Sequence, residues 1–383
     1  MSSKAKYEYL LQIRERYRRA SKKEKKVILD EFCKVCGYNR KYAITLLNKP
    51  VTQISADNLS RRGRHAIYDH ILIETVLFDI WKVTNMPCSK RLKAIIREWL
   101  PFYDKHQLPD EIRRLLLSIS PATIDRLLKP HRHRYGKKGL ATTKPGSLLK
   151  KHIPVKTNQW NEQKPGFLET DTVAHCGTSM AGMFAFTINS VDIFSQWTVQ
   201  RAVWGKGEKG VLNAISDMER QLPFPIKGFD CDNGSEFLNW HLIRYFQDRK
   251  QPVQFSRSRP YHKNDNAHIE NKNWTHIRQY LGYGRFDDPR IVDMLNDLYQ
   301  NEWYYYFNFF ISNVKLIKKE RIGSKIIKKY DKPITPFQRL LASNHINEET
   351  KQRLQHEKDK LNPFEIQRQM TKKIEAIMKL VYQ

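Results

Sequence analysis

Residues 166–173 read GFLETDTV, and two similar runs follow, GMFAFTINSVDIF at 182–194 and WTVQRAVW at 197–204. These runs alternate or stay apolar and are rich in β-branched and aromatic residues, which predicts three neighbouring β-strands. The elements predicted next are a helix at 208–222, a strand at 226–232, a helix at 235–250 that Ser235 caps, a strand at 252–258 and a long helix from about Asn266 to Tyr280. Three strands followed by alternating helices and strands predict a central α/β domain with a mixed sheet, at residues 158–310.

The chain before this domain has helical spacing. Apolar residues recur three and four positions apart from residue 6 to about 129, which predicts an all-α region at residues 1–128. Two helix pairs have the spacing of a helix-turn-helix; one turns at Gly37, and the other turns at Ser120-Pro121, where Ser120 can cap the second helix. Candidate DNA contacts on the second helices are Asn39, Arg40 and Lys41 in the first pair, and Thr123, Asp125 and Arg126 in the other.

Two basic segments flank the central domain. Residues 129–156 contain nine Lys or Arg and no acid, and we interpret residues 129–157 as an extended basic linker that can lie along phosphates. Residues 311–383 are again basic and then mostly helical, and they form either a small third domain or extended arms. The predicted fold class is therefore α+β and multidomain.

Charge is the strongest global signal. The 383 residues include 68 Lys or Arg and 40 Asp or Glu, a net charge of +28, which favours a polyanionic partner such as nucleic acid. No run of about 18 apolar residues and no secretory signal is present, so we expect a cytoplasmic protein without a membrane partner. The five cysteines are odd in number and scattered, which argues for a reducing compartment, and we expect Cys33 and Cys36 to be packing residues.

Three acids stand at informative places in the central domain. Asp171 lies in the middle of the first strand, Asp232 follows a later strand in CDNGSEF, and Glu270 lies near the start of the long helix. Carboxylates from three elements, without a Cys/His set, are the oxygen ligands that Mg²⁺ or Mn²⁺ prefers. Two such ions about 4 Å apart could activate a nucleophile and stabilise the leaving oxygen of a phosphodiester.

The spacing of these motifs carries a family resemblance. ETDTV, then DNGSEF sixty residues later and NDNAHIENKNW after thirty-seven more resemble the D, D-N-G-x-E-F and N-x-x-x-E signature of DDE transposases and retroviral-type integrases. The resemblance covers roughly residues 160–285, and the helical region before it is similar to that of bacterial insertion-sequence transposases.

The resemblance implies an RNase H-like fold and a divalent-metal site that cuts DNA and transfers strands. It implies that Asp171, Asp232 and Glu270 are the catalytic metal ligands and that Asn266 is the asparagine of the last motif. Two departures are the second spacer, which is slightly longer than usual, and Ala267, which replaces the glycine that usually follows the asparagine. The zinc module of retroviral integrases is missing.

Several neighbouring residues leave alternatives open. Asp230 could replace Asp232 as a ligand, but only Asp232 is followed directly by the Asn-Gly turn. Glu169 could contribute to the site or be a surface or pairing charge, and we expect Glu236 in the first turn of the following helix. Asp265 is expected to cap the long helix. Three further basic residues near the last ligand are candidate DNA contacts: Lys263, Lys272 and Arg278.

The sequence thus predicts a transposase that binds the terminal inverted repeats of a mobile element and its target DNA as a homo-oligomer, associated with the bacterial nucleoid. Two alternatives are an inert DNA-binding regulator of transposase origin and a metal-dependent nuclease without strand transfer. The aromatic run NEWYYYFNFF at 301–310 could stack on bases, but we expect it to pack in the core.

Overall fold

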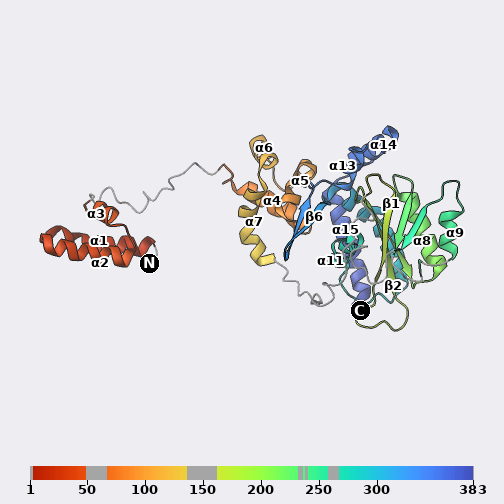
Figure 1. Ribbon diagram of the computed structural model, residues 1–383, viewed down its shortest axis with the longest axis horizontal. Coiled ribbons are helices and arrows are strands. Elements are labelled where there is room, and N and C mark those ends of the chain that lie inside the picture. Colours follow the sequence, from red (N-terminus) through yellow and green to blue (C-terminus); the bar gives the residue numbers. More distant parts are fainter. Residues whose placement is uncertain are drawn as a thin grey trace. The chain divides into compact units, whose positions relative to one another are not determined.

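The computed structural model describes residues 3–48, 67–135, 162–231, 236–237, 240–257 and 267–382. The chain divides into two compact units, Met1–Ile67 and Tyr68–Gln383 (Figure 1). In the described ranges the protein is α+β, as expected, with helices at both ends and a mixed sheet between them. No helix in these ranges has the length and apolar character needed to cross a membrane.

In its described part, residues 3–48, the first unit contains the helices α1 (Ser3–Arg19), α2 (Lys22–Cys36) and α3 (Arg40–Asn48). Ser21 and Glu24 form a capping box at the start of α2, and Gly37 ends it in the left-handed conformation (φ 65°) that glycine adopts without strain. The helices share a small core of Leu10, Phe32 and Leu47. Cys36 is buried in this core and Cys33 packs against it, which confirms their predicted packing role.

The second unit opens with α4 (Ile71–Val83), α5 (Ser89–Trp99), the 3₁₀ helix η3 (Leu100–Phe102), α6 (Asp110–Ser118) and α7 (Pro121–Tyr135). Ser120 Oγ accepts a hydrogen bond from Thr123 N (3.1 Å), so the predicted cap and the predicted first helical residue, Pro121, are confirmed. Helix α7 continues to Tyr135, into the segment that the sequence predicted as linker.

The central sheet has the strand order β3-β2-β1-β4-β5. Its strands are β1 (Phe167–Ala174), β2 (Ala185–Asp192), β3 (Thr198–Trp204), β4 (Gly228–Cys231) and β5 (Gln254–Arg257). The first three strands are antiparallel neighbours, as predicted, whereas β4 pairs parallel with β1 and β5 parallel with β4. Helices α8 (Glu208–Gln221) and α9 (Trp240–Gln247) lie on one side of the sheet in Figure 1.

The other side carries the long helical segments. They are α10 (Ala267–Lys272), the π-helical turn η5 (Asn273–Arg278), α11 (Gln279–Leu281), α12 (Arg290–Leu298), and the π-helical turns η6 (Tyr299–Trp303) and η7 (Tyr306–Phe310). Most of the aromatic run at 301–310 is buried, so its predicted core role is confirmed. Trp99 Nε1 donates to Phe310 O (3.1 Å) and Tyr306 Oη to Val83 O (2.9 Å), which joins α4 and α5 to this core. Helices α4–α7 therefore belong with the sheet rather than with α1–α3, because they share its core.

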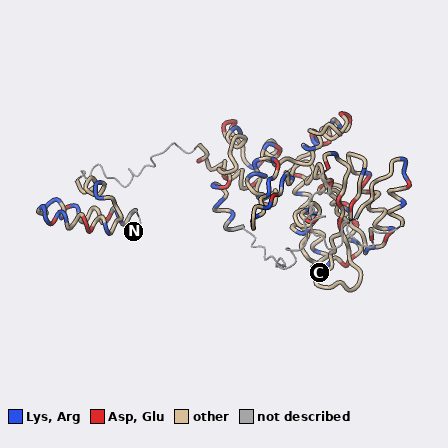
Figure 2. Tube along the Cα trace, viewed as in Figure 1, with Lys and Arg blue, Asp and Glu red and all other residues tan. Residues whose placement is uncertain are grey.

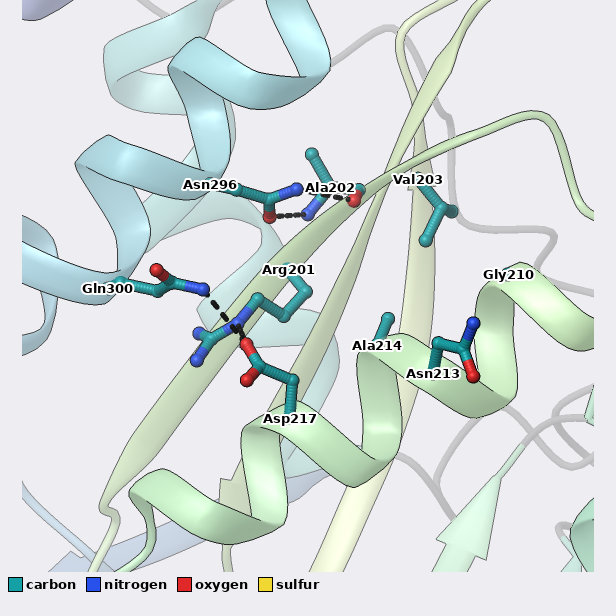
Figure 3. A pocket seen from close by; sticks show the side chains of 9 residues that line it. All are labelled: Arg201, Ala202, Val203, Gly210, Asn213, Ala214, Asp217, Asn296 and Gln300. Carbon is teal, nitrogen blue, oxygen red and sulfur yellow. Dashed lines mark hydrogen bonds and ion pairs between the residues drawn. The ribbon is translucent and has the colours of Figure 1, made fainter.

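Side chains cover the free backbone of the edge strand β3. Asn308 exchanges two hydrogen bonds of 2.8 Å with the backbone of Thr198, and Asn296 exchanges two with Ala202 (2.7 and 3.0 Å; Figure 3). Arg201 Nη1 donates to the carbonyl of Gln200 (2.6 Å). A pocket of about 230 Å³ lies beside this edge, between β3, α8 and α12. These side chains take the place of a further strand and block pairing with another chain at this edge.

The C-terminal part is an antiparallel hairpin followed by helices. The hairpin consists of β6 (Leu316–Ile322) and β7 (Lys325–Tyr330), and the helices are α13 (Pro336–Leu341), α14 (Glu348–Asp359) and α15 (Pro363–Val381). Buried residues of α13, α14 and α15 join the core of the sheet unit, so the part beyond residue 311 is not a separate domain. The hairpin is a difference from the sequence-based expectation of a mostly helical region.

Candidate active site

Helix α10 is attached to strand β1 at two points. Successive side chains of a strand alternate between its faces, so Glu169 and Asp171 share one face of β1. Glu169 Oε2 accepts hydrogen bonds from the backbone nitrogens of His268 and Ile269, each 3.1 Å long. Asp171 Oδ2 accepts a hydrogen bond of 2.7 Å from Asn273 Nδ2. Glu270 lies between these attachment points, so the fold holds its helix over the strand that carries Asp171.

Asp171 is half-buried and its carboxylate is oriented on both oxygens. Oδ1 accepts a hydrogen bond from the backbone nitrogen of Thr172 (2.8 Å), and Oδ2 accepts the one from Asn273. Glu270 is exposed. The parallel register of β1 and β4 ends at Thr170 and Cys231, the residues immediately before Asp171 and Asp232. Asp232 itself lies outside the described residues, one peptide bond after Cys231.

Three amide side chains form a series of hydrogen bonds that begins in the protein interior and ends at Asp171. Gln200 Nε2 donates to Asn189 Oδ1 (2.9 Å), Asn189 Nδ2 donates to Asn273 Oδ1 (2.8 Å), and Asn273 donates to Asp171. In each of these hydrogen bonds the residue farther from Asp171 is the donor. Gln200 and Asn189 are fully buried. Asn273 begins the π-helical turn η5, a local widening that often accompanies functional sites. We name Gln200, Asn189 and Asn273 the amide chain.

Glu169 is buried, so of the alternatives that the sequence left open for it a surface charge is excluded. Burial raises the pKa of Glu169 to about 8, and the negative charges of Asp230 and Glu270 act in the same direction, while its hydrogen bonds from the helix backbone oppose them. Asp230, its direct neighbour on β4, is also buried and accepts a hydrogen bond from Ser256 Oγ (2.7 Å). The acidic side chains of β1, β4 and α10 therefore lie close enough together to interact electrostatically.

Glu236 does not lie in a helix, so its predicted place in a first helical turn is wrong. It forms part of a turn, and α9 begins only at Trp240. Its buried carboxylate accepts a hydrogen bond from Thr172 Oγ1 (3.1 Å) and pairs with Lys206. Burial is the largest single effect and acts to raise the pKa of Glu236, but the hydrogen bonds from Lys206, Thr172 and the backbone and the positive charge of Lys206 together outweigh it, so the pKa is lowered. The pairing explains the turn, because the carboxylate is drawn to Lys206 and Thr172.

Five of the six candidate DNA contacts in the N-terminal helices are exposed, Thr123 is half-buried, and some of the six have intramolecular partners. Asn39 Oδ1 accepts from Lys41 N (3.0 Å) at the start of α3, and Arg40 pairs with Asp30. Lys41 itself is exposed. Arg126 donates to Thr123 Oγ1 (3.1 Å) on the second helix of the other pair.

The candidate DNA contacts near the site differ in accessibility. Lys272 is buried, and burial together with the positive charges of Arg91 and Arg339 lowers its pKa to about 7, which is at odds with a surface contact. Arg278 is half-buried and donates to the carbonyls of Ala174 (2.6 Å) and Gly282 (3.2 Å). Lys263, Asp265 and Asn266 lie outside the described residues.

Comparison with known proteins finds a relative by sequence. The chain is 36% identical over 331 residues, 85% of its own length, to the "Uncharacterized protein y4rM" of Sinorhizobium fredii (strain NBRC 101917 / NGR234), and the match spans 92% of that protein. The chain belongs to the y4rM family. No protein-family model matches it.

Two solved structures similar to this y4rM-family chain are viral integrase cores. The catalytic core domain of BIV integrase is 13% identical and covers 47% of this chain and 96% of its own, with a TM-score of 0.28. The HTLV-2 integrase catalytic core domain in complex with magnesium is 16% identical and covers 40% of this chain and 91% of its own, also with a TM-score of 0.28. TM-scores this low do not define the fold or the function of the y4rM-family chain.

The acids at this place in the y4rM-family chain are donors of the type that a hard divalent cation prefers. Asp171 and Glu270 offer carboxylate oxygens from a strand and a helix, and the negative charge around buried Glu169 is what a cation would offset. Within the ranges that the structure describes, no group of three His, Cys, Asp or Glu side chains could hold a metal ion. The third predicted ligand, Asp232, lies outside those ranges, so the described residues alone do not form a complete set of three ligands.

Proposed function

We propose that the chain is a DDE-type transposase, which binds the ends of a mobile DNA element as a homo-oligomer and cuts and joins DNA. Its RNase H-like domain would hold Mg²⁺ or Mn²⁺, as two ions, with Asp171, Asp232 and Glu270. The observation that carries the proposal is the double attachment of α10 to β1 through Glu169 and Asp171. It holds the helix of Glu270 over β1, beside the predicted ligand Asp171. Strand β4 pairs with β1 and ends one residue before the other predicted ligand, Asp232.

The residues of the chain have distinct parts in this proposal. Bound divalent ions would activate the attacking oxygen and stabilise the leaving oxygen of a phosphodiester. Asn273 and the backbone of Thr172 orient the Asp171 carboxylate, which limits the directions from which it can bind a cation. Glu169 fixes the first turn of α10 and thereby positions Glu270.

The surrounding charge supports a DNA substrate. The chain has a net charge of +28, and Lys and Arg lie over both units in Figure 2. Such a field attracts a polyanion, and each phosphate that is neutralised releases counterions. A local cluster of acids in a strongly basic protein is expected where metal ions reverse the local charge.

Asp232→Asn tests the proposal. We expect the variant to lose cleavage of DNA that carries the element ends in Mg²⁺, while it binds the same DNA as the wild type does. Asp293→Asn, an exposed acid on α12, is the matched control and should retain cleavage. Full cleavage by Asp232→Asn would refute the assignment.

Strand transfer needs a separate assay, since the same ions serve hydrolysis and joining. A pre-nicked end oligonucleotide supplied with a target plasmid should yield joined products. Hydrolysis without joined products would identify a nuclease instead. Binding without either product would identify a DNA-binding regulator.

A further inference from the structure

The β6–β7 hairpin is an exposed arm of basic and apolar side chains. Gly323 and Ser324 form its two-residue tip, and Gly323 has the positive φ (60°) that such turns require. Every residue of β7 is exposed. No described part of the protein therefore covers β7 in a way that would account for its sequence.

Its composition favours a polyanionic partner. Residues 316–330, LIKKERIGSKIIKKY, contain six Lys or Arg and one acid, Glu320, which pairs with Lys318 (Figure 2). Between the charges, Ile326 and Ile327 are 57% and 51% exposed. An arm with this mixture can neutralise phosphates with its lysines and contact apolar groups of a partner with its isoleucines.

The pairing of the two strands places like charges together. Lys318 lies directly opposite Lys329 in the antiparallel register. Like charges opposite each other destabilise a strand pair, and a two-stranded hairpin alone is marginally stable in water. Binding to a polyanion would offset this repulsion.

The root of the arm is fixed to the body of the protein. Asp331 pairs with Arg339 and accepts a hydrogen bond from Lys315 N (2.6 Å), directly below the hairpin. Lys315 Nζ donates to Phe194 O (2.9 Å), in the turn after β2. The hairpin is therefore held at its base while its tip is exposed.

The same turn contacts the helix of the candidate active site. Gln196 Nε2 lies 3.4 Å from His268 Nδ1, at the beginning of α10, two residues before Glu270. The base of the arm thus contacts the same turn that contacts the helix of a predicted ligand.

We propose that the β6–β7 hairpin is a DNA-binding arm that enters the major groove of duplex DNA next to the candidate active site. The proposal rests on the proposed function for its partner. A two-stranded ribbon, with strands about 5 Å apart and a length of roughly 20 Å, fits a major groove about 12 Å wide. Ile326 and Ile327 lie on opposite faces of the ribbon, so one of them faces the base edges while lysines of the arm contact the phosphates that flank the groove.

A charge-removal variant tests the arm in the full chain. The triple variant K325Q/K328Q/K329Q changes only exposed side chains of β7. Binding to a fluorescent 30-base-pair duplex is measured against salt by anisotropy in EDTA, where cleavage does not interfere. We expect affinity to fall about tenfold or more near physiological salt and the slope of log affinity against log salt to flatten by ~2–3.

Two controls separate a specific arm from a change in net charge. R353Q/K360Q/K372Q removes the same charge from exposed positions of α14, α15 and their connection, and it should bind duplex with nearly the wild-type slope. K325R/K328R/K329R keeps the charge and should restore binding. A melting curve for each variant confirms that it folds.

Wild-type binding and slope in K325Q/K328Q/K329Q would overturn the proposal, as would equal losses in the control triple. If K325Q/K328Q/K329Q binds duplex DNA as the wild type does but no longer binds anionic phosphatidylserine vesicles, the partner of the hairpin is a membrane surface and the proposal is wrong. The outcomes also separate the two proposals. If duplex binding depends on the hairpin but no metal-dependent cleavage occurs, the DNA-binding arm is supported and the proposed enzyme activity is refuted. If cleavage occurs but duplex binding does not depend on the hairpin, the enzyme activity is supported and the arm is refuted.

Discussion

Asn273 donates a hydrogen bond of 2.7 Å from Nδ2 to Oδ2 of Asp171, across 102 positions of the sequence. It joins the helix of one predicted metal ligand to the strand of another. Asn273 is the first residue of the π-helical turn, and together with the backbone nitrogen of Thr172 it orients the Asp171 carboxylate.

Asn273→Ala should lower metal-dependent cleavage about 10- to 100-fold, because the Asp171 carboxylate loses its orientation. A purely structural role would change stability alone. We therefore expect the Mg²⁺ concentration for half-maximal activity to rise as well, in a metal titration of the cleavage rate. An unchanged metal midpoint would contradict the positioning role.

The amide chain should act as a unit. Gln200→Leu leaves Asn189 Oδ1 without its donor in the interior, which should lower the free energy of unfolding by about 1–3 kcal/mol. In a double-mutant cycle for cleavage, the effects of Gln200→Leu and Asn273→Ala should be less than additive, since each breaks the same chain. Additive effects would show that Gln200 does not act through Asn273.

The covered edge of β3 predicts that replacing Asn308 and replacing Asn296 lower the free energy of unfolding by different amounts. Asn308→Ala should destabilise the protein by about 2–3 kcal/mol, because two backbone groups of Thr198 lose their partners in the interior. Asn296→Ala should cost only about 1 kcal/mol, because Asn296 is half-buried and water can reach Ala202. Urea denaturation measures both values. A larger loss for Asn296→Ala would contradict this account of the edge.

The pH dependence of stability should reflect His175. Burial lowers its pKa from 6.5 to about 3, and its ring stacks on Phe286 with a centroid distance of 4.4 Å. The folded state binds the proton less well than the unfolded state, so this contribution is complete above pH 6.5 and is lost as the pH falls toward 3. At pH 5 the free energy of unfolding should therefore be about 2 kcal/mol lower than above pH 6.5 because of this group.

Histidine replacement isolates that contribution. His175→Gln removes the titrating ring, so its unfolding free energy should fall less steeply between pH 6.5 and 5 than that of the wild type. Chemical denaturation at each pH gives the slope. Identical slopes for the two proteins would show that His175 is not the group responsible.

Local patterns predicted the strands β1, β2 and β3 and the cap of α7, because alternation and capping depend on nearby residues. The cap at Ser120 is such a case. The contact of Asn273 with Asp171 was not predicted, since it depends on how α10 packs and on a π-helical turn that changes the phase of the helix. Glu236 was misplaced for a similar reason, because its partner Lys206 is distant in sequence.

The hairpin shows a signal that could have been used. Two short runs rich in isoleucine flank Gly323-Ser324, a dipeptide typical of two-residue hairpin turns. The many lysines lowered the apparent strand propensity and made the region resemble an exposed helix. The asparagines that cover β3 gave no comparable signal, because an asparagine within a helical pattern is usually a surface residue.

Binding of Mn²⁺ to the purified full chain, followed by electron paramagnetic resonance, tests the central claim most directly. The wild type and the control Asp293→Asn should bind saturably. Asp171→Asn, Asp232→Asn and Glu270→Gln should each bind far more weakly while they keep the wild-type melting temperature. Wild-type Mn²⁺ binding in all three variants would contradict a metal site formed by Asp171, Asp232 and Glu270.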